Sequence, residues 1–367
     1  MSAADDTRFM RLALSLGRRG LGNTAPNPAV GCVIVKNRRI LGRGWTQPGG
    51  RPHAETVALA QAGAAARGAD VFVTLEPCAH HGQTPPCAQA LIAAQVARVV
   101  VAVADSDPRV NGAGLAMLRA AGIAVVTGLC ADSAASDLAG YFLKTEQERP
   151  FVTLKLANSF DGRIATGSGE SQWITGPQAR RAVHAMRARH DAVMVGAGTA
   201  RQDDPSLTVR GLGVTRQPAR VVVSRRLDVP LMGTLGRTAR DVPVLMCHGR
   251  DADPGLQDVW RDLGAVLVPC ATIGSQLDPG DILRQLAQRG ITRVFCEGGS
   301  ALAASMIDAD LVDRLVGFTA GVMIGAEGLP NVGALGLGRL AGAARFDLLS
   351  VRSVGNDICH EWARAAR

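Results

Sequence analysis

His53, Cys78 and Cys87 are the residues that most restrict how this chain can fold. One imidazole and two thiolates are ligands for a tetrahedral Zn²⁺, but they bind one ion only if the fold brings three distant positions to one point. Three protein ligands also leave one corner of the tetrahedron for a water molecule, which the metal acidifies. Glu55 follows the histidine closely and is placed to carry protons. The pattern therefore predicts hydrolytic removal of an amino group from a base-like ring.

The start of a helix is the one place where His53 and Glu55 can serve the same metal. Positions i and i+2 diverge by about 200° in the body of a helix, so both reach one ion only where the first residues curl around the N-terminus. The preceding loop, GWTQPGGRP, suits the entry to such a helix. A His-x-Glu pair followed by Pro-Cys is the signature of zinc deaminases, in which the glutamate is not a ligand. This chain departs from that signature, because eight residues separate its two cysteines instead of about two.

Cys78 follows a predicted strand, and Cys87 begins a predicted helix behind two prolines. The N-terminus of a helix favours the thiolate, which is the form that binds metal. A structural zinc with four protein ligands is the alternative, with His80 or His81 as the fourth. Glu55 would then have no purpose, so we favour a catalytic zinc.

The length of the chain predicts two domains, since 367 residues exceed one ordinary domain. The polar stretch from Lys144 to Pro150 is the expected boundary, which gives domains over 1–146 and 150–367. In the first domain strands alternate with helices, and this pattern predicts an α/β fold with a mostly parallel sheet covered on both faces. Its helices are expected over 8–19, 54–66, 87–95 and 112–121, and its strands over 30–35, 71–75, 99–103 and 123–127.

The second domain begins a new alternating series but ends differently. The segments 315–324 and 346–363 look extended, without long helices between them, so the sheet is expected to finish with antiparallel strands and to be mixed. Earlier strands are expected over 151–157, 191–196, 219–224, 242–247, 264–268 and 292–297, with helices over 176–188, 255–263 and 280–288.

The formal charge of +8 points to acidic partners. Nucleic acids normally bind a concentrated basic patch with aromatic residues, whereas here the arginines are scattered and the chain has one tyrosine. We therefore expect no nucleic-acid partner and favour small phosphorylated molecules, with a mere preference for arginine as the ordinary alternative. The first residues lack the basic start of a signal peptide, and no apolar run reaches the ~18 residues of a membrane span. A cytoplasmic location without a membrane partner is expected.

The segment TLEPCAHHGQTPPC, which follows NPAVGCVIV and HAE, resembles the deaminase half of the bifunctional riboflavin-biosynthesis deaminase–reductases. FVTLKLANSFDGRIA and GESQWITG resemble their reductase half, and the likeness spans nearly all of residues 8–365. It implies a cytidine-deaminase-like α/β/α domain followed by a dihydrofolate-reductase-like mixed-sheet domain. It also implies zinc-dependent deamination of 2,5-diamino-6-ribosylamino-4(3H)-pyrimidinone 5′-phosphate, then NADPH-dependent reduction of the ribosyl group to ribityl. A homo-oligomer is the expected assembly.

Matched position by position, the resemblance assigns residues to each site. Zinc would be held by His53, Cys78 and Cys87, with Glu55 as the catalytic acid and base and Asn27 against the substrate. The cofactor-binding positions are Ala157, Trp173, Thr199, Asp203, Gly299, Ser300, Ala301, Leu302, Ala303, Ala304 and Ser305. The substrate-binding positions of the second domain are Ser171, Arg187, Leu207, Arg210 and Glu297.

Residue chemistry supports parts of the second site. Arg187 and Arg210 are credible phosphate ligands because a guanidinium binds two oxygens at once, although a solvated surface charge is the ordinary alternative for any single arginine. The stretch 297–300 runs from a strand through two glycines into a helix whose first N–H groups would cradle a phosphate, unless it is a simple tight turn. Ser224-Arg225 stands where relatives commonly have Asp-Ser, and the added cation would fit NADPH over NADH.

Lys155 is one of only three lysines among 40 basic residues. In strand alternation Thr153, Lys155 and Ala157 share one face. A sequence that otherwise uses arginine keeps an ammonium here, in a segment expected to be buried. We hypothesise that this compact charge contacts polar groups of the substrate near the reacting carbon, and chance placement is the alternative.

Three other functions stay open at this stage. A nucleic-acid-editing deaminase would fit the basic charge, but it leaves residues 151–367 without a role and lacks an aromatic platform for bases. A zinc-stabilised scaffold with a degenerate reductase also agrees with the sequence. So does a chain in which only one half is active.

Overall fold

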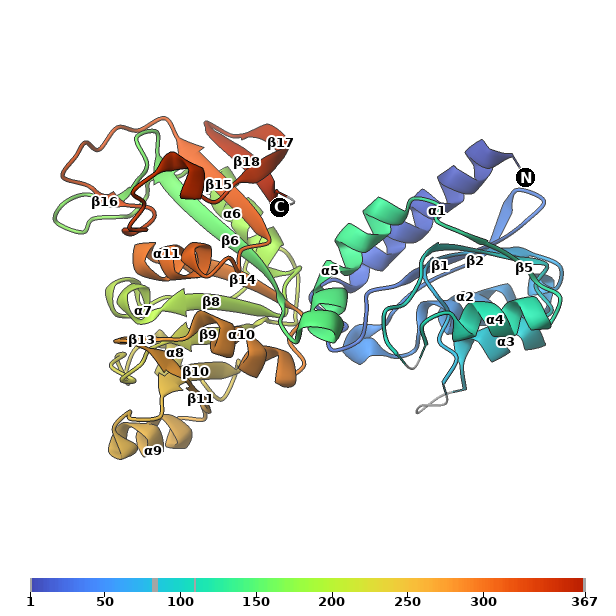
Figure 1. Cartoon of the computed structure of the whole chain (residues 1–367), viewed down its shortest axis with the longest axis horizontal. Coiled ribbons are helices and arrows are strands. Elements are labelled where there is room, and N and C mark those ends of the chain that lie inside the picture. Colours follow the sequence, from blue (N-terminus) through green and yellow to red (C-terminus); the bar gives the residue numbers. More distant parts are fainter. Residues whose placement is uncertain (1, 81–84, 109, 366–367) are drawn as a thin grey trace. The chain divides into compact units, whose positions relative to one another are not determined.

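The chain divides into two compact units, Met1–Glu148 and Arg149–Arg367. The computed structural model describes residues 2–80, 85–108 and 110–365. Figure 1 draws the first unit in blue to green and the second in green to red. The division falls inside the polar stretch that was expected to separate the domains.

That polar stretch is mostly helix, and the sequence analysis did not predict this helix. Helix α5 (Ala131–Gln147) continues through it and ends at Glu148, whose φ of 54° is left-handed. The helix forms because apolar side chains on one side, such as Leu138 and Phe142, pack against the sheet while its polar residues face outward. The charged residues of this stretch therefore belong to the outer face of an amphipathic helix.

A five-stranded sheet in the order β2-β1-β3-β4-β5 forms the centre of the first unit. Its strands are β1 (Gly31–Lys36), β2 (Arg39–Trp45), β3 (Asp70–Leu75), β4 (Arg98–Val103) and β5 (Ala124–Thr127). β3, β4 and β5 are parallel, but β1 runs antiparallel to both β2 and β3. The mostly parallel sheet expected here was wrong, because Asn37 and Arg38 both adopt positive φ and close a two-residue hairpin from β1 into the unexpected strand β2.

Helices cover both faces of this sheet, so the unit is an α/β/α sandwich. The helices α2 (Ala54–Ala62), α3 (Cys87–Ala93) and α4 (Ala113–Ala120) bury apolar residues against one face. Helix α1 (Ala3–Gly17) and the start of α5 bury theirs against the other. Short 3₁₀ turns occupy Arg18–Gly20, Pro48–Gly50 and Gly63–Ala66.

Glycines on β2 bring α2 unusually close to the sheet. A Cβ on Gly44 would lie 2.1 Å from the carbonyl oxygen of Ala54, and one on Gly42 would lie 2.1 Å from that of Ala58. No larger residue fits either position without moving the helix. This contact fixes the first turn of α2, which directly follows His53.

The second unit contains a nine-stranded sheet in the order β11-β10-β9-β8-β14-β6-β15-β18-β17. Its strands run parallel from β11 to β15, while β18 is antiparallel to its neighbours β15 and β17. The expected antiparallel end and mixed sheet are confirmed. The strands are β6 (Phe151–Ser159), β8 (Ala192–Gly196), β9 (Ala219–Val223), β10 (Val244–Gly249), β11 (Val266–Cys270), β14 (Arg293–Gly298), β15 (Arg314–Ala320), β17 (Phe346–Val354) and β18 (Asp357–Arg364).

The helices of the second unit also lie on both faces of its sheet, as Figure 1 shows. Two apolar clusters, one on each face, bury the central strands. The helices are α6 (Pro177–Arg187), α7 (Ala197–Asp203), α8 (Thr234–Arg237), α9 (Pro254–Asp262), α10 (Pro279–Gln288) and α11 (Ser300–Asp308). Two small antiparallel pairs join β12 (Thr272–Ile273) to β13 (Gln276–Leu277) and β7 (Arg163–Ala165) to β16 (Leu329–Pro330), and a 3₁₀ turn spans Leu340–Gly342. Among the described residues, no helix combines the length and the apolar character needed to cross a membrane.

Candidate active sites in the two units

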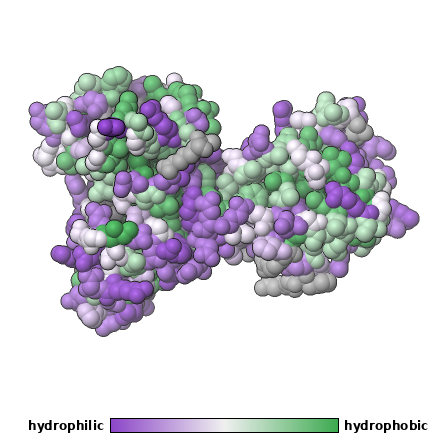
Figure 2. Space-filling view, in the orientation of Figure 1, coloured by the Kyte–Doolittle hydropathy of each residue, from purple (hydrophilic) through white to green (hydrophobic). Residues whose placement is uncertain are grey.

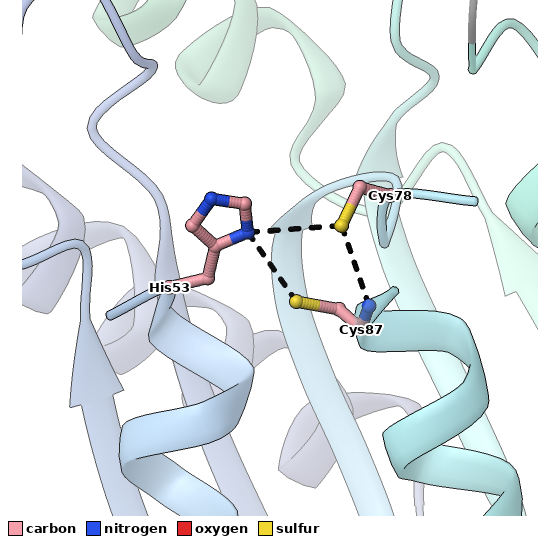
Figure 3. A group of neighbouring side chains, drawn as sticks. All are labelled: His53, Cys78 and Cys87. Atoms are coloured by element: carbon pink, nitrogen blue, oxygen red, sulfur yellow. Dashed lines mark hydrogen bonds between the residues drawn. The ribbon is translucent and has the colours of Figure 1, made fainter. Parts of the chain in front are cut away.

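The structure brings His53, Cys78 and Cys87 together from three different elements (Figure 3). His53 caps the N-terminus of α2, Cys78 lies in the loop after β3, and Cys87 is the first residue of α3. The Nδ1 atom of His53 lies 3.7 Å from Sγ of Cys78 and 3.4 Å from Sγ of Cys87. The helix-start geometry expected for the histidine and for Cys87 is what the fold provides.

These distances fit a zinc ion. With Zn–N near ~2.1 Å and Zn–S near ~2.3 Å, a tetrahedral arrangement separates a nitrogen ligand from a sulfur ligand by about 3.6 Å. His80, considered as a fourth ligand, is not part of the group, while His81 lies outside the described residues. Within the described chain, three residues converge and a fourth coordination position is left for a small molecule.

Glu55 lies beside these ligands and is only 3 % exposed. Burial raises the pKa of its carboxyl to about 7, although the nearby imidazole of His53 opposes this shift. A carboxyl group with a pKa near the working pH can both accept and donate a proton. Glu55 therefore lies beside the three ligands rather than among them, and its pKa suits a proton carrier.

Glu76 holds the loop that carries Cys78, a role that the sequence analysis missed. Its carboxylate accepts hydrogen bonds of 3.0 to 3.3 Å from four backbone N–H groups, those of Asp105, Gly112, Gly114 and Leu115. A Cβ on Gly114 would lie 2.0 Å from the Pro77 carbonyl oxygen, so α4 begins in direct contact with this loop. The only sequence signal was the acidic residue directly before Pro77-Cys78.

Asn27 supports the loop on the other side of the site. Its side-chain amide donates a 2.9 Å hydrogen bond to the carbonyl of Gly50, three residues before His53. Gly50 has a φ of 88°, and a Cβ there would lie 2.3 Å from the Asn27 amide nitrogen. The side chain of Asn27, which was expected to bind the substrate, therefore also makes a structural hydrogen bond.

A cavity of about 990 Å³ marks the second site. It lies at the carboxyl ends of the parallel strands β6, β8, β9 and β14, which is where open α/β sheets usually bind ligands. Most of the positions expected from the sequence line it: Lys155, Ala157, Ser171, Trp173, Arg187, Thr199, Asp203, Leu207, Arg210, Glu297, Gly299, Ser300, Ala301, Leu302 and Ser305.

Ala303 and Ala304 are the exceptions. The sequence analysis placed the whole run from Gly299 to Ser305 along the cofactor, but both alanines are buried and neither lines the cavity. Ala303 packs in the core cluster beneath α11. Helix geometry explains why they lie away from the cavity, since about 3.6 residues complete a turn and a continuous run cannot all face one way.

A buried group of charges forms the floor of this cavity. Arg187 binds Glu297 through two hydrogen bonds, Nε to Oε1 at 2.5 Å and Nη2 to Oε2 at 2.9 Å. Burial would raise the pKa of Glu297, but the charges of Arg187 and Lys155 outweigh it and hold the pKa below its usual value. Burial lowers the pKa of Lys155, with Glu297 opposing, and burial raises that of Asp203, with Lys155 opposing.

Arg187, expected from the sequence to bind substrate, lines the cavity and also makes hydrogen bonds within the chain. Nε and Nη2 donate to Glu297, and Nη1 donates to the carbonyl of Thr208 at 2.9 Å, so three of the five N–H groups of the guanidinium are already used. Arg210, in contrast, lines the cavity and is exposed. A phosphate in this cavity would therefore meet Arg210 before Arg187.

The turn into α11 fits a phosphorylated cofactor. Gly298 and Gly299 have φ values of 70° and 96°, and a Cβ on Gly299 would lie 2.7 Å from Oγ1 of Thr199. That hydroxyl donates to the Gly298 carbonyl at 3.1 Å and fixes the turn. The first residues of α11 line the cavity, and the N-terminus of a helix suits a phosphate.

Several lining residues were not singled out from the sequence. His184 and Arg180 share a helix face with Arg187, a spacing of three or four residues that the sequence does contain. The Arg180 guanidinium lies over the Trp173 ring, 4.4 Å from its centre, at the edge of the cavity. Arg225 also lines the cavity, so the arginine of the Ser224-Arg225 pair lies at this site.

Comparisons with known proteins agree with both sites. Residues 3–103 match the family described as "Cytidine and deoxycytidylate deaminase zinc-binding region", and residues 150–360 match the "RibD C-terminal domain". The chain is 40% identical over 366 residues to the riboflavin biosynthesis protein RibD of Escherichia coli, covering 96% of this chain and 98% of that one. It is 41% identical over 373 residues to the RibD of Haemophilus influenzae, covering 97% and 96%.

Solved structures give the same result. RibD from Acinetobacter baumannii, form 1, is 38% identical and has a TM-score of 0.89, with 100% of both chains covered. A diaminohydroxyphosphoribosylaminopyrimidine deaminase/5-amino-6-(5-phosphoribosylamino)uracil reductase from Thermotoga maritima is 32% identical, with a TM-score of 0.87 and 99% of both chains covered. The chain therefore belongs to the RibD family of riboflavin-biosynthesis proteins, with a zinc-binding deaminase region followed by a reductase domain.

Proposed function

We propose that the first unit deaminates 2,5-diamino-6-ribosylamino-4(3H)-pyrimidinone 5′-phosphate and that the second unit reduces the ribosyl group of the product to ribityl with NADPH. The observation that carries the proposal is the convergence of His53, Cys78 and Cys87 beside a buried glutamate, in a chain whose second unit has a large, charged cavity. The Thermotoga maritima relative is named for the same two activities.

In the first reaction, Glu55 moves the protons. When bound by the three ligands, Zn²⁺ makes a water molecule acidic and so supplies the nucleophile. The carboxylate of Glu55 accepts a proton, delivers it to the ring nitrogen, and then protonates the departing amine. The products are ammonia and a ring carbonyl, so one water is consumed for each amino group released.

In the second reaction, the cavity positions two molecules against each other. NADPH supplies a hydride when bound. We assign the turn formed by Gly299 and Thr199 to the cofactor's phosphates, and the exposed guanidinium of Arg210 to the phosphate of the substrate. Lys155 and Glu297 face the same space with opposite charges and suit hydrogen bonds to the ribose hydroxyls near C1′.

Arg225 supports the choice of NADPH. It lies two residues after the end of β9 and lines the cavity, and its Nε atom is buried without a hydrogen-bond partner. Its Nη2 atom donates to Asp251 at 2.6 Å and its Nη1 atom donates to the carbonyl of Ser275 at 3.4 Å, and these contacts orient the guanidinium. A phosphate on the 2′-hydroxyl of the cofactor would meet this cation, whereas NADH has no such group.

Free thiols and an exposed edge strand support two further proposals. We propose a cytoplasmic location, since all eight cysteines are free and a reducing compartment keeps thiols in that state. We also propose a homo-oligomer, because strand β17 leaves one side of the nine-stranded sheet uncovered.

The test is to incubate the purified chain with the phosphorylated diaminopyrimidine, with and without NADPH, and to follow ammonia and the absorbance of NADPH separately. We expect ammonia in both reactions and NADPH oxidation only after ammonia release has begun. Ammonia from cytidine or tRNA, with the pyrimidine phosphate inert, would show that the proposal is wrong.

A further inference from the structure

The segment 205–218, which joins α7 to β9, contains no helix or strand. It carries Leu207 and Arg210, which line the cavity at positions expected to bind the substrate. Among the described residues, no hydrogen bond between two backbone groups involves residues 205–217. Leu207 and Val209 are nevertheless only 2 % and 5 % exposed, and buried backbone groups need partners. Side chains must therefore hold this segment in place.

Gln217 supplies both partners for the backbone of Val209. Its Oε1 atom accepts a 2.6 Å hydrogen bond from the N–H of Val209, and its Nε2 atom donates a 3.2 Å hydrogen bond to the carbonyl of the same residue. A residue in a sheet exchanges the same two bonds with a neighbouring strand. Since Pro218 is buried and β9 begins at the next residue, Gln217 is itself anchored at the sheet.

Helix α6 binds the residue before Val209. Nη1 of Arg187 donates to the carbonyl of Thr208 at 2.9 Å, and Nδ1 of His184 lies 3.1 Å from the same oxygen. Burial alternates along the segment, with Thr208 less buried than its two neighbours, as in an extended chain. Successive carbonyls of an extended chain point to opposite sides. The segment is therefore held by α6 on one side and by Gln217 on the other.

Arg210 depends on these contacts because it stands at the start of an exposed loop. The carbonyl of Val209 and the N–H of Arg210 belong to one planar peptide group, so the bond from Gln217 to that carbonyl sets the direction in which Arg210 leaves the segment. Residues 211–216 are mostly exposed, and a Cβ on Gly211 or Gly213 would meet no atom within 4 Å. The loop gives Arg210 little support, and Gln217 closes it.

We propose that Gln217 is a positioning residue of the reductase, which holds the guanidinium of Arg210 where it binds the phosphate of the substrate. The inference rests on the proposed assignment of Arg210 to that phosphate, and it names the residue that keeps this part of the site in shape. Gln217 does not line the cavity, so it acts only through the segment that it holds. A preorganised group binds more tightly because less of its freedom is lost on binding. Replacement of Gln217 should weaken phosphate binding and leave hydride transfer unchanged.

The test replaces the amide by an apolar side chain of similar length. In Gln217→Met, we expect the KM of the reductase for the deaminated pyrimidine phosphate to rise about tenfold, while kcat changes less than about twofold. The KM for the same compound without its phosphate should not change. The affinity for NADP⁺, measured by calorimetric titration, should also stay at the wild-type value.

Gln257→Met is the matched control. Gln257 also donates to a backbone carbonyl, that of Ala252 at 2.9 Å, but it belongs to α9 and does not line the cavity. Figure 2 shows mainly hydrophilic residues at the end of the second unit where Figure 1 draws α9. The control therefore removes the same kind of hydrogen bond at a surface helix, and we expect its kinetic constants to match those of the wild type.

A double-mutant cycle with Arg210→Ala shows whether Gln217 acts through Arg210. We expect R210A to raise the KM for the phosphate at least as much as Q217M, and R210A/Q217M to resemble R210A, because two residues that act through one contact are not additive. The inference is wrong if Q217M behaves like Q257M, if the two effects multiply, or if Q217M also weakens NADP⁺ or the compound without phosphate. An unchanged KM in R210A would overturn the assignment of Arg210 as well. A wild-type chain that oxidises no NADPH with this compound would overturn both the inference and the proposed function.

Discussion

Lys155 illustrates how a single residue can be found by its chemistry before its surroundings are known. A rare lysine in an arginine-rich chain drew attention to it, and strand alternation gave its direction. The structure places it in the cavity, near Glu297, Arg187 and Asp203. Burial lowers its pKa below 10.5, although Glu297 opposes the shift. The negative charge of Glu297, rather than water, therefore stabilises the protonated form of the Lys155 amine.

Substitution of Lys155 should slow the reductase and leave the deaminase unchanged. Lys155→Met removes a cation that we place near the reacting carbon, so we expect the NADPH oxidation rate to fall about 100-fold. Lys155→Arg should restore part of the rate. It should also shift the alkaline limb of the pH–rate profile upward, because a guanidinium keeps its charge at higher pH than a buried ammonium. An unchanged reductase rate in the arginine variant would refute this role.

Arg225 should govern the choice between the two nicotinamide cofactors. Arg225→Ala removes the cation expected to meet the 2′-phosphate, so affinity for NADP⁺ should fall about tenfold or more while affinity for NAD⁺ changes little. Calorimetric titration measures both without any reaction. Arg226→Ala, an exposed neighbour outside the cavity, is the control. Equal losses for the two cofactors would contradict the assignment.

At the scale of elements, hydrophobic periodicity predicted most strands and helices within a few residues, because the central strands are buried on both faces and read as continuous apolar runs. Among the elements that it missed are the 17-residue helix α5, the strand β2, whose exposed residues and glycines form no apolar pattern, and α7, a seven-residue helix built from small and polar residues. The zinc group was predictable because one histidine and two cysteines in this order and spacing rarely occur together by chance. The Arg187–Glu297 pair was not, since its two partners lie on α6 and β14 and only the fold brings them together.

His190 contacts residues of α6, β6 and β14. Because it is buried, we expect the second unit to lose stability at acidic pH. It follows α6, donates from Nδ1 to the Met186 carbonyl at 2.7 Å, and accepts at Nε2 from the Thr153 hydroxyl on β6 at 2.9 Å. Its ring also packs against that of Phe295 on β14. Burial lowers its pKa to about 3, and the charge of Arg293 acts in the same direction. The folded chain therefore keeps this imidazole neutral where the unfolded chain would protonate it.

The sign of the effect follows from proton binding. Between about pH 6.5 and pH 3 the unfolded chain binds a proton at His190 that the folded chain does not, so stability should decrease as the pH falls, by up to about 1.4 kcal/mol per unit. His190→Gln should lower the stability at neutral pH and flatten this dependence between about pH 6 and pH 5. Urea unfolding followed by tryptophan fluorescence checks it, since Trp173, Trp260 and Trp362 all lie in the second unit. A wild-type slope retained in H190Q would contradict the assignment.

At the scale of the whole molecule, the two candidate sites are formed by residues of different units. The zinc ligands and Glu55 belong to the first unit, and every residue that lines the large cavity belongs to the second. The two reactions therefore depend on separate groups of residues, and a substitution in one unit should leave the chemistry of the other unit unchanged. The two family matches also fall in different units, residues 3–103 in the first and residues 150–360 in the second.

The account depends on three ligands that hold one zinc beside a proton carrier that is not a ligand. The direct measurement is the metal content of the wild-type chain, Glu55→Gln and Cys87→Ser, together with ammonia release from the pyrimidine phosphate. We predict about one zinc per chain in the wild type and in E55Q and loss of zinc in C87S, with ammonia release in E55Q reduced by about 10² to 10⁴-fold. A wild-type chain without stoichiometric zinc, or an E55Q variant that loses its metal or keeps full activity, would contradict it.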